Sequence, residues 1–283
     1  MKPRSLRRRH GFNALIRWIS TFGALIGLIA LLWILYVVLQ RGFSAFNFTF
    51  FTQLPMPPGM KGGGLANAIV GTLLLTGMAA VLATPVGIAA GVYLAEFGKG
   101  TKLGSAIRFL TNLMVGIPSI IVGVFVYTLL VMPAKTFSTH AGAVSLAIIM
   151  LPVIVRTTED MLNMVPNSLR EAGLALGAPN WRVILGIVFR AARSGMLTGV
   201  LLAVARVSGE TAPLLFTALN SPYWMRSLNE PTANLTVTIF NYAMSPYADW
   251  KSQAWGASLL IMGGVLALTV IARAILGSKG YRR

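Results

Sequence analysis

The chain has 283 residues, of which 55% are hydrophobic and 11% charged, whereas an ordinary soluble domain has about 25% charged residues. Several stretches longer than about 18 residues carry almost no charge, which excludes a soluble globular domain and is typical of membrane-spanning helices. The net charge of +17 would suit a nucleic-acid-binding protein, but the basic residues lie in short connections between apolar stretches, so we expect a membrane partner and no nucleic acid.

The first apolar stretch, residues 18–40, follows a basic segment, residues 1–17, that contains Arg7, Arg8 and Arg9. It is longer than the apolar core of a signal peptide and ends in Gln40 and Arg41, without a small-residue cleavage site. We therefore expect a retained transmembrane helix preceded by a cytoplasmic tail.

The whole pattern predicts an all-α polytopic membrane protein. Eighteen Lys and Arg residues fall on the side that holds both termini and five on the other, so the positive-inside rule places both ends, including residues 277–283, in the cytoplasm. The fourth span must either end with Arg156 at the surface or carry it below the membrane. The six predicted spans are at about 18–40, 67–94, 106–132, 141–161, 194–219 and 253–276.

Two longer loops lie on the outer side. Residues 41–66 are rich in Pro and Gly, which predicts little regular structure, and five phenylalanines enter this loop. They fit an aromatic belt at the membrane interface, or else a docking surface for an external partner. The second loop, residues 220–252, has Trp and Tyr residues near its ends.

A short cytoplasmic helix is predicted at residues 168–177. Ser168 and Glu171 have the spacing of a capping box, and Gly177 is placed to end the helix. Its apolar face comprises Leu169, Ala172, Gly173 and Leu176, with small residues where another protein would touch it. The segment is either such a docking helix or a connector without a partner.

The fifth predicted span carries Arg206 and Glu210 at mid-depth, where an ionised side chain costs about 2.5–3.5 kcal/mol on insertion scales. At i and i+4 they could pair on one helix face, either as a structural ion pair or as part of an anion path. Arg offers a planar donor fork to oxyanions, and Glu210 could accept a hydrogen bond from an oxyanion that carries a proton. Pro213 predicts a kink beside them.

Two segments resemble a known family. Glu171, Ala172 and Gly173, followed by Gly177 and Ile187, match the spacing of the loop motif of ATP-binding-cassette (ABC) importer permeases, although Gly173 replaces an alanine and Phe189-Arg190 replaces Leu-Pro. The stretch 205–215, with Leu151-Pro152 and residues 156–162, resembles the PstA-type permeases of phosphate-specific transport systems.

This resemblance implies a type I ABC importer permease fold, with a core at residues 67–276 that contains five transmembrane helices, in the bacterial inner membrane. It implies that residues 168–177 form the coupling helix that docks on an ATPase, and that Arg206, Glu210 and Arg156 are associated with phosphate passage. Physical reasoning alone reads Arg156 as a positive-inside anchor. The implied partners are a second homologous permease, two ATPase subunits that hold ATP and Mg, and a periplasmic phosphate-binding protein.

Other sites are excluded or weakly supported. The sequence has no cysteine and no G-x-x-x-x-G-K-[ST] loop, so we expect no thiol chemistry, no ATP hydrolysis by this chain and no bound cofactor. Its two histidines, His10 and His140, are isolated, so no metal site is predicted. Two alternatives stay open: a permease for another oxyanion, such as molybdate or sulfate, and an ion-coupled secondary transporter.

Overall fold

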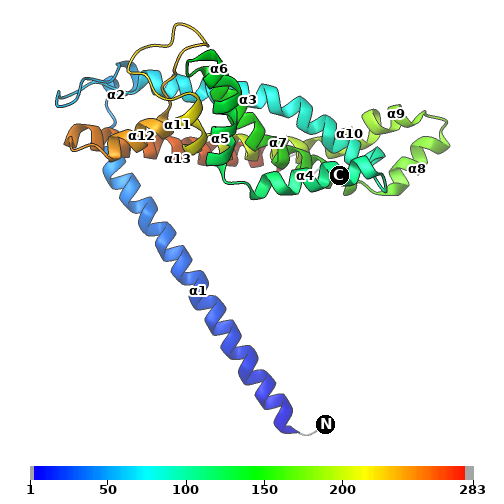
Figure 1. Ribbon diagram of the computed structural model, residues 1–283. Helices are drawn as coiled ribbons and strands as arrows, with labels where there is room; N and C mark the ends of the chain where they lie inside the picture. The colour runs from blue at the N-terminus through cyan, green and yellow to red at the C-terminus, as the bar shows by residue number, and fades with distance from the viewer. Residues whose placement is uncertain (1–2, 278–283) are drawn as a thin grey trace.

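The computed structural model describes residues 3–277, and this part of the chain is helical apart from loops and one isolated bridge between Pro55 and Gly63. The predicted tail at 277–283 lies almost entirely outside the described residues. An elongated helical bundle carries a separate long helix that projects from it (Figure 1). The prediction of an all-α membrane protein is confirmed. Five helices are long and apolar enough to span a membrane, or six if one bent pair counts as a span.

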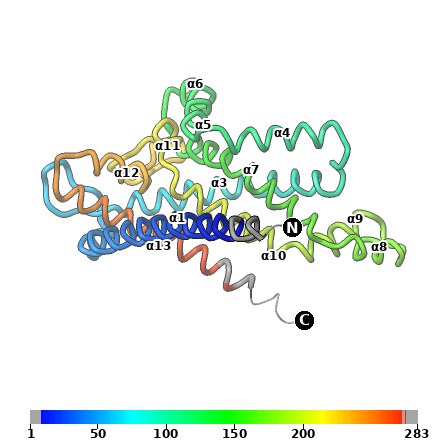
Figure 2. The backbone as a smooth tube through the Cα atoms, turned by 90° about the horizontal axis from the view of Figure 1, so that it is seen from below, coloured from blue at the N-terminus to red at the C-terminus, as the bar shows by residue number. Residues whose placement is uncertain are grey.

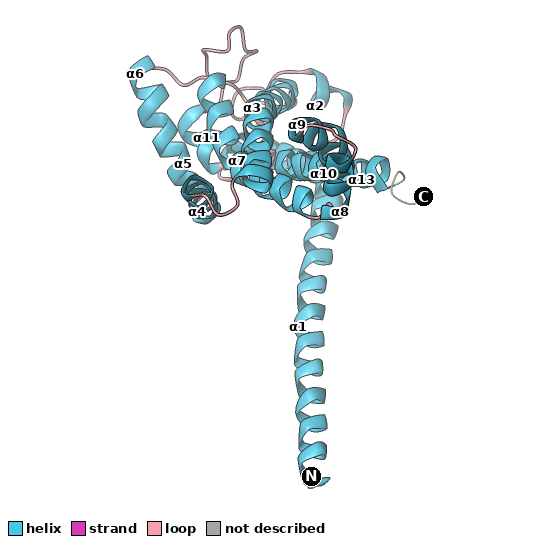
Figure 3. Cartoon of the chain, turned by 90° about the vertical axis from the view of Figure 1, so that its right-hand side faces the viewer, coloured by secondary structure: helices cyan, strands magenta, loops and turns pink. Residues whose placement is uncertain are grey.

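The first helix, α1 (Pro3–Phe43), starts well before the predicted span, so most of the predicted tail at 1–17 is helical. Its last turn packs on α13 (Ala248–Gly277): a Cβ on Gly42 would lie 2.6 Å from Cβ of Leu259, and the Arg41 guanidinium lies 5.2 Å from the Trp255 ring centre. The rest of α1 stands away from the bundle, and the side chains of residues 9–34 are exposed (Figure 3).

Helices α3 (Ala66–Val92) and α7 (Thr139–Asn163) form the centre of the bundle. They approach closely because Gly87 and Gly91 on α3 face Ile154 and Thr158 on α7, and a Cβ on either glycine would lie less than 3 Å from those side chains. Small residues at i and i+4 are how membrane helices bring their backbones together. The buried core around them includes Leu75, Ala79, Ala83, Leu146, Met150, Ile154, Ala203, Val207, Leu214 and Val237.

The predicted third span, 106–132, is wrong as a continuous helix. Helix α4 (Lys102–Gly116) ends at Ile117-Pro118, and the chain restarts in α5 (Ser119–Val126), bent by 105°. Pro118 has no N–H to donate and disfavours helical geometry at the preceding residue, and Ile117 accordingly has an extended ψ of 126°. Figure 2 shows α4 running back along the bundle before the chain turns into α5. The π-helical turn η2 (Tyr127–Val131) and α6 (Met132–Ala134) complete this arm.

The predicted fifth span, 194–219, is displaced. The spanning helix runs from Asn180 to Val207 through α9 (Asn180–Val183), the π-helical turn η3 (Ile184–Val188) and α10 (Phe189–Val207). A non-helical stretch follows, and then the short helix α11 (Ala212–Thr217). The kink predicted from Pro213 is therefore a complete break.

The two ends of the bundle differ. The hairpin of α8 (Asn167–Ala175) and α9 forms one end, which we name the hairpin end; it also holds the π-helical turn η1 (Tyr93–Phe97) that closes α3 (Figure 1). The opposite end, the loop end, holds α2 (Phe48–Thr52) and α12 (Leu235–Ala243).

Both predicted outer loops thus contain a helix, although at 41–66 it is the five-residue α2 alone and most of that loop is irregular, as predicted. Asn47 caps α2 by accepting a hydrogen bond from the Phe50 backbone N–H at 2.7 Å. The Phe50 side chain is 1% exposed, because it packs into a cluster with Leu65 and Tyr242. This phenylalanine therefore belongs to the protein core and not to an aromatic belt.

Candidate functional site

A cavity of about 340 Å³ lies where two helix breaks meet the continuous helix α7. The breaks are those between α4 and α5 and between α10 and α11, and α7 contributes Pro152 from within the helix. Pro118 and Pro213 lie at or near the two breaks, so each break has a local cause. The lining residues are Met114, Val115, Gly116, Ile117, Pro118, Ser119, Val122, Ile148, Ile149, Pro152, Arg206 and Glu210.

Arg206 and Glu210 both line this cavity, but they do not share a helix face as predicted. Arg206 lies in the last turn of α10, and Glu210 lies beyond the end of that helix. Backbone hydrogen bonds from the Gly209 N–H to Arg206 and from the Glu210 N–H to Val207 tighten the chain into turns. Pro213 has no N–H with which to continue the helix.

Among the described residues, ion pairs within 4.0 Å involve Arg108 with Glu159 and Arg170 with Glu96, and neither Arg206 nor Glu210. The interpretation of Arg206 and Glu210 as an internal ion pair is therefore not what the structure shows. Arg206 is exposed and Glu210 half-buried within the single chain. Apart from these two residues, the cavity is lined by apolar residues and Ser119. The Arg206 guanidinium is therefore free to bind an anion.

The backbone at Glu210 is fixed from another element. The buried hydroxyl of Thr236, on α12, donates to the Glu210 carbonyl oxygen at 2.9 Å. Asn234 in turn caps α12 by accepting from the Val237 backbone N–H at 2.9 Å. The break between α10 and α11 is therefore held in place by the helix at the loop end of the bundle.

Arg156 does not line the cavity. It lies on α7 four residues beyond Pro152, hence on nearly the same face and about 6 Å further along the helix axis toward the hairpin end. Its side chain is exposed. This position allows it to attract an anion one helical turn from the cavity.

The short helix predicted at 168–177 is observed as α8, but its start differs. The helix begins at Asn167 after Pro166 and has no side-chain cap, so Ser168 lies inside the first turn and the predicted capping box is wrong. The predicted end is confirmed. Gly177 has φ of +79°, its N–H donates to Leu174 and the Ala178 N–H donates to Gly173, which together make a Schellman motif.

The predicted apolar face of α8 divides into an inner and an outer part. Gly173 is buried: a Cβ there would lie 2.7 Å from Ile187 and 3.0 Å from Val183, so it allows α8 to pack on α9 and η3. Glu171 and Ala172 are exposed, as are Leu169 and Leu176, of which Leu176 is 88% exposed. Exposed apolar side chains of this kind mark an interaction surface. Leu174 and Trp181 are further exposed apolar side chains of the hairpin and were not predicted.

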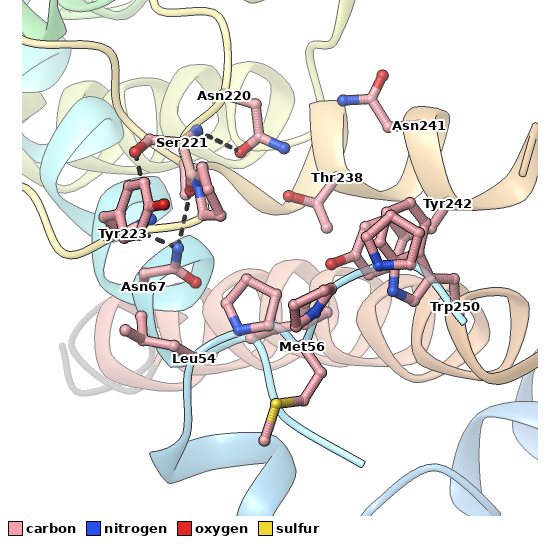
Figure 4. A pocket seen from close by; sticks show the side chains of 16 residues that line it. Leu54, Met56, Asn67, Asn220, Ser221, Tyr223, Thr238, Asn241, Tyr242 and Trp250 are labelled. Carbon is pink, nitrogen blue, oxygen red and sulfur yellow. Dashed lines mark hydrogen bonds between the residues drawn. The ribbon is translucent and has the colours of Figure 1, made fainter. Parts of the chain in front are cut away.

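The loop end has a larger cavity of about 570 Å³, shown in Figure 4. Asn67 donates from Nδ2 to the Ser221 carbonyl at 2.9 Å, and the rings of Tyr242 and Trp250 stack with centres 4.3 Å apart. Burial raises the pKa of Tyr242 to about 12, so its hydroxyl stays protonated at physiological pH. The cavity is lined by uncharged residues, which distinguishes it from the cavity at Arg206 and Glu210.

Within residues 3–277, no group of three or more His, Asp and Glu side chains is arranged to hold a metal ion. The break at Ile117-Pro118 was missed although a proline within an apolar stretch predicts a helix boundary. The ion pairs of Arg108 and Arg170 were also missed, and no local pattern could have found them, because their partners are 51 and 74 residues away.

Comparisons with known proteins agree with this architecture. The family model of binding-protein-dependent transport system inner membrane components matches residues 87–277. The phosphate transport system permease protein PstA of Yersinia pestis is 48% identical over 280 residues, which cover 99% of this chain and 94% of that protein. PstA of Haemophilus influenzae is 47% identical over 267 residues, 94% of each chain.

A solved structure is similar in fold. A chain of the MetNI methionine ABC transporter, crystallised in inward-facing conformations, superposes with a TM-score of 0.63 at 20% identity, over 76% of this chain and 95% of that chain. At this identity the similarity supports the helix arrangement alone.

Proposed function

The chain belongs to the family of binding-protein-dependent transport system inner membrane components, and from this membership we propose how it moves its substrate. It is the permease component of a phosphate-specific ABC transporter, a multi-pass protein of the inner membrane. It is not itself catalytic, because ATP is handled by a partner ATPase. Our proposal concerns the residues that form the phosphate path and those that couple it to the ATPase.

We propose that phosphate passes the cavity between the two helix breaks and α7. The observation that carries this proposal is that Arg206 lines the cavity without an ion-pair partner among the described residues. A guanidinium on a largely apolar cavity of a membrane protein needs a counter-charge or water, and a passing phosphate supplies the counter-charge. Glu210, on the same cavity, opposes permanent trapping of the anion, and Arg156 draws phosphate onward one turn away.

The hairpin end is the proposed ATPase contact. The outer surface of α8, with Leu169, Ala172 and Leu176 exposed beside Glu171, would sit in a cleft of the ATPase. Gly173 contributes by close packing of the hairpin, and Gly177 by ending the helix at the exposed tip. An amphipathic helix laid into an apolar groove is a recurrent mode of protein recognition.

An ABC importer permease implies ATPase and binding-protein partners, and we propose the finer composition. A second homologous permease would complete the path, two ATPase subunits with ATP and Mg would bind at the hairpin end, and a periplasmic phosphate-binding protein would dock at the loop end. Exposure of Arg206 in the single chain supports a second permease, because a path through the membrane must be enclosed.

Uptake of labelled phosphate tests the function. Cells that lack their own high-affinity phosphate system would receive this chain with its partner subunits, and uptake would be measured after ATP depletion and, separately, after addition of an uncoupler. We expect loss of uptake on ATP depletion and little direct effect of the uncoupler. The reverse would favour an ion-coupled transporter, and competition by molybdate or sulfate in place of phosphate would favour another oxyanion.

A further inference from the structure

Two arginines from different helices contact the π-helical turn η1. Arg170 reaches it from α8 in the hairpin, and Arg108 reaches it from α4, which leads to the cavity. Neither arginine is assigned a part in phosphate passage or in ATPase docking. Both make charged contacts far apart in sequence at the hairpin end of the bundle.

All three guanidinium nitrogens of Arg170 donate hydrogen bonds. Its Nη2 lies 2.8 Å from Oε1 of Glu96, in η1, and its Nε lies 3.4 Å from Oε2 of the same carboxylate. Its guanidinium also donates to the carbonyl oxygens of Leu162, in the last turn of α7, at 2.9 Å and of Val165, just beyond that helix, at 2.6 Å. The side chains of Arg170 and Glu96 are only 16% and 9% exposed, so this is a largely buried pair.

Arg108 makes a similar set of contacts. Its Nε lies 2.7 Å from Oε1 of Glu159 on α7, and its two terminal nitrogens donate to the carbonyl oxygens of Leu94 at 2.8 Å and Gly98 at 3.3 Å. Backbone packing reinforces the link, because a Cβ on Gly104 of α4 would lie 2.1 Å from the Gly98 carbonyl oxygen.

These contacts join the hairpin to η1 and η1 to α4. A bidentate arginine pair fixes orientation as well as distance, and removal of one partner leaves the other charge buried and unpaired. Single π-helical turns often occur at functional sites, where they allow a local change of helix winding. Here η1 continues the end of α3; its Leu94 carbonyl accepts a hydrogen bond from Arg108, and its Glu96 carboxylate accepts from Arg170.

A continuous chain of contacts leads from α8 to the phosphate cavity. From α8 it passes through Arg170 and Glu96 to η1, and from there through Arg108 to α4. Helix α4 ends at Gly116, which lines the cavity together with the Ile117-Pro118 break. The Arg108–Glu159 pair adds a branch to α7, which carries Pro152 in the same cavity.

We propose that Arg170 and Glu96, with Arg108 and Glu159, are positioning residues that transmit movement of the ATPase-facing hairpin to the α4–α5 break and so open or close the phosphate cavity. This inference rests on the proposed function. In this role the four residues couple ATP hydrolysis to anion movement; they neither hydrolyse ATP nor bind the anion.

The test measures phosphate uptake and ATP hydrolysis in the assembled transporter reconstituted in lipid vesicles. For Arg170→Gln and for Glu96→Gln we expect uptake per ATP hydrolysed to fall roughly tenfold, within the range of measured coupling energies, while ATPase activity persists. The charge exchange Arg170→Glu with Glu96→Arg should recover part of the ratio. Arg190→Gln, an exposed arginine at the start of α10, is the matched control and should leave the ratio unchanged.

A second measurement does not depend on phosphate. Because the chain has no cysteine, Ser119→Cys places its only thiol in the cavity, and the rate of thiol labelling reports how open the cavity is. We expect this rate to respond to ATP in the otherwise unchanged chain and to lose that response with Arg170→Gln.

Three outcomes would contradict either the transmission role of Arg170 or the proposed function. An unchanged uptake-per-ATP ratio and an ATP-responsive thiol in Arg170→Gln would overturn the transmission role. Loss of ATPase activity and assembly in both single variants would also overturn it, since the pair would then serve the fold alone. Failure of the unaltered transporter to move phosphate would instead refute the proposed function, while the thiol measurement would still decide the role of Arg170.

Discussion

Arg206 and Glu210, four residues apart in sequence, line one cavity from different structural elements: Arg206 from the last turn of α10 and Glu210 from the break that follows it. On a continuous helix the same spacing would favour an ion pair. Because the helix ends between them, each side chain faces the cavity without forming an ion pair with the other. The two charges are therefore available to a third group.

Substitution of Arg206 is expected to stop phosphate passage. Arg206→Gln removes the cation, and since hydrogen bonds to charged groups contribute about 1.5–3 kcal/mol, uptake should fall roughly 10- to 100-fold. Arg206→Lys should retain part of the activity, because it keeps the charge but loses the planar fork. The measurement is labelled-phosphate uptake with co-purification of the partner subunits as the check on assembly.

Arg193→Gln is the matched control for this experiment, because Arg193 is exposed on the same helix and does not line the cavity. It should leave uptake near that of the unaltered protein. Normal uptake by an assembled Arg206→Gln transporter would make Arg206 a structural residue.

Glu210 is expected to contribute to selectivity between oxyanions. A carboxylate accepts a hydrogen bond from monohydrogen phosphate but finds no such donor on sulfate. Glu210→Gln preserves shape and removes the charge, so the preference for phosphate over sulfate should decrease by about tenfold or more, since buried hydrogen-bonding groups discriminate strongly. Competition of unlabelled sulfate against labelled phosphate measures this directly, and an unchanged preference would refute the role.

The sequence predicted the main elements well where the signal was local. The span at 141–161 is observed as Thr139–Asn163, and Gly177 ends α8 with the expected positive φ. Continuous apolar character marks a span, and a glycine after an amphipathic segment marks a helix end. In both cases the residues that carry the signal are also those that determine the structure.

The same apolar signal failed at the helix breaks. Hydropathy does not distinguish a straight span from two half-helices, so α4 and α5 were merged across Pro118 and α10 was extended past Val207. The cavity itself depends on how these breaks come together. The partners of Arg108 and Arg170 likewise follow from tertiary packing, which no spacing within the sequence encodes.

The contact between α3 and α7 should tolerate no added methyl group at Gly91. A Cβ there would lie 2.5 Å from Thr158 Cβ and 2.8 Å from the Val155 carbonyl oxygen. Overpacking a close contact costs about 1–3 kcal/mol, so Gly91→Ala should lower the thermal unfolding midpoint of the detergent-purified protein. Gly77→Ala on the same helix meets nothing within 4 Å and should be neutral or slightly stabilising. Equal midpoints for the two variants would contradict this view of the packing.

Two substitutions of Gly177 should distinguish the effect of the backbone at the hairpin tip from the effect of ATPase docking. Its φ of +79° costs an L-residue about 1–2 kcal/mol, so Gly177→Ala should loosen the end of α8 and reduce coupling moderately. Gly177→Trp has the same backbone cost and adds a large ring beside the exposed Leu176, so we expect it to block ATPase docking and abolish uptake. Co-purification of the ATPase with each variant distinguishes the two effects. Normal co-purification and uptake with Gly177→Trp would show that this tip does not enter the ATPase.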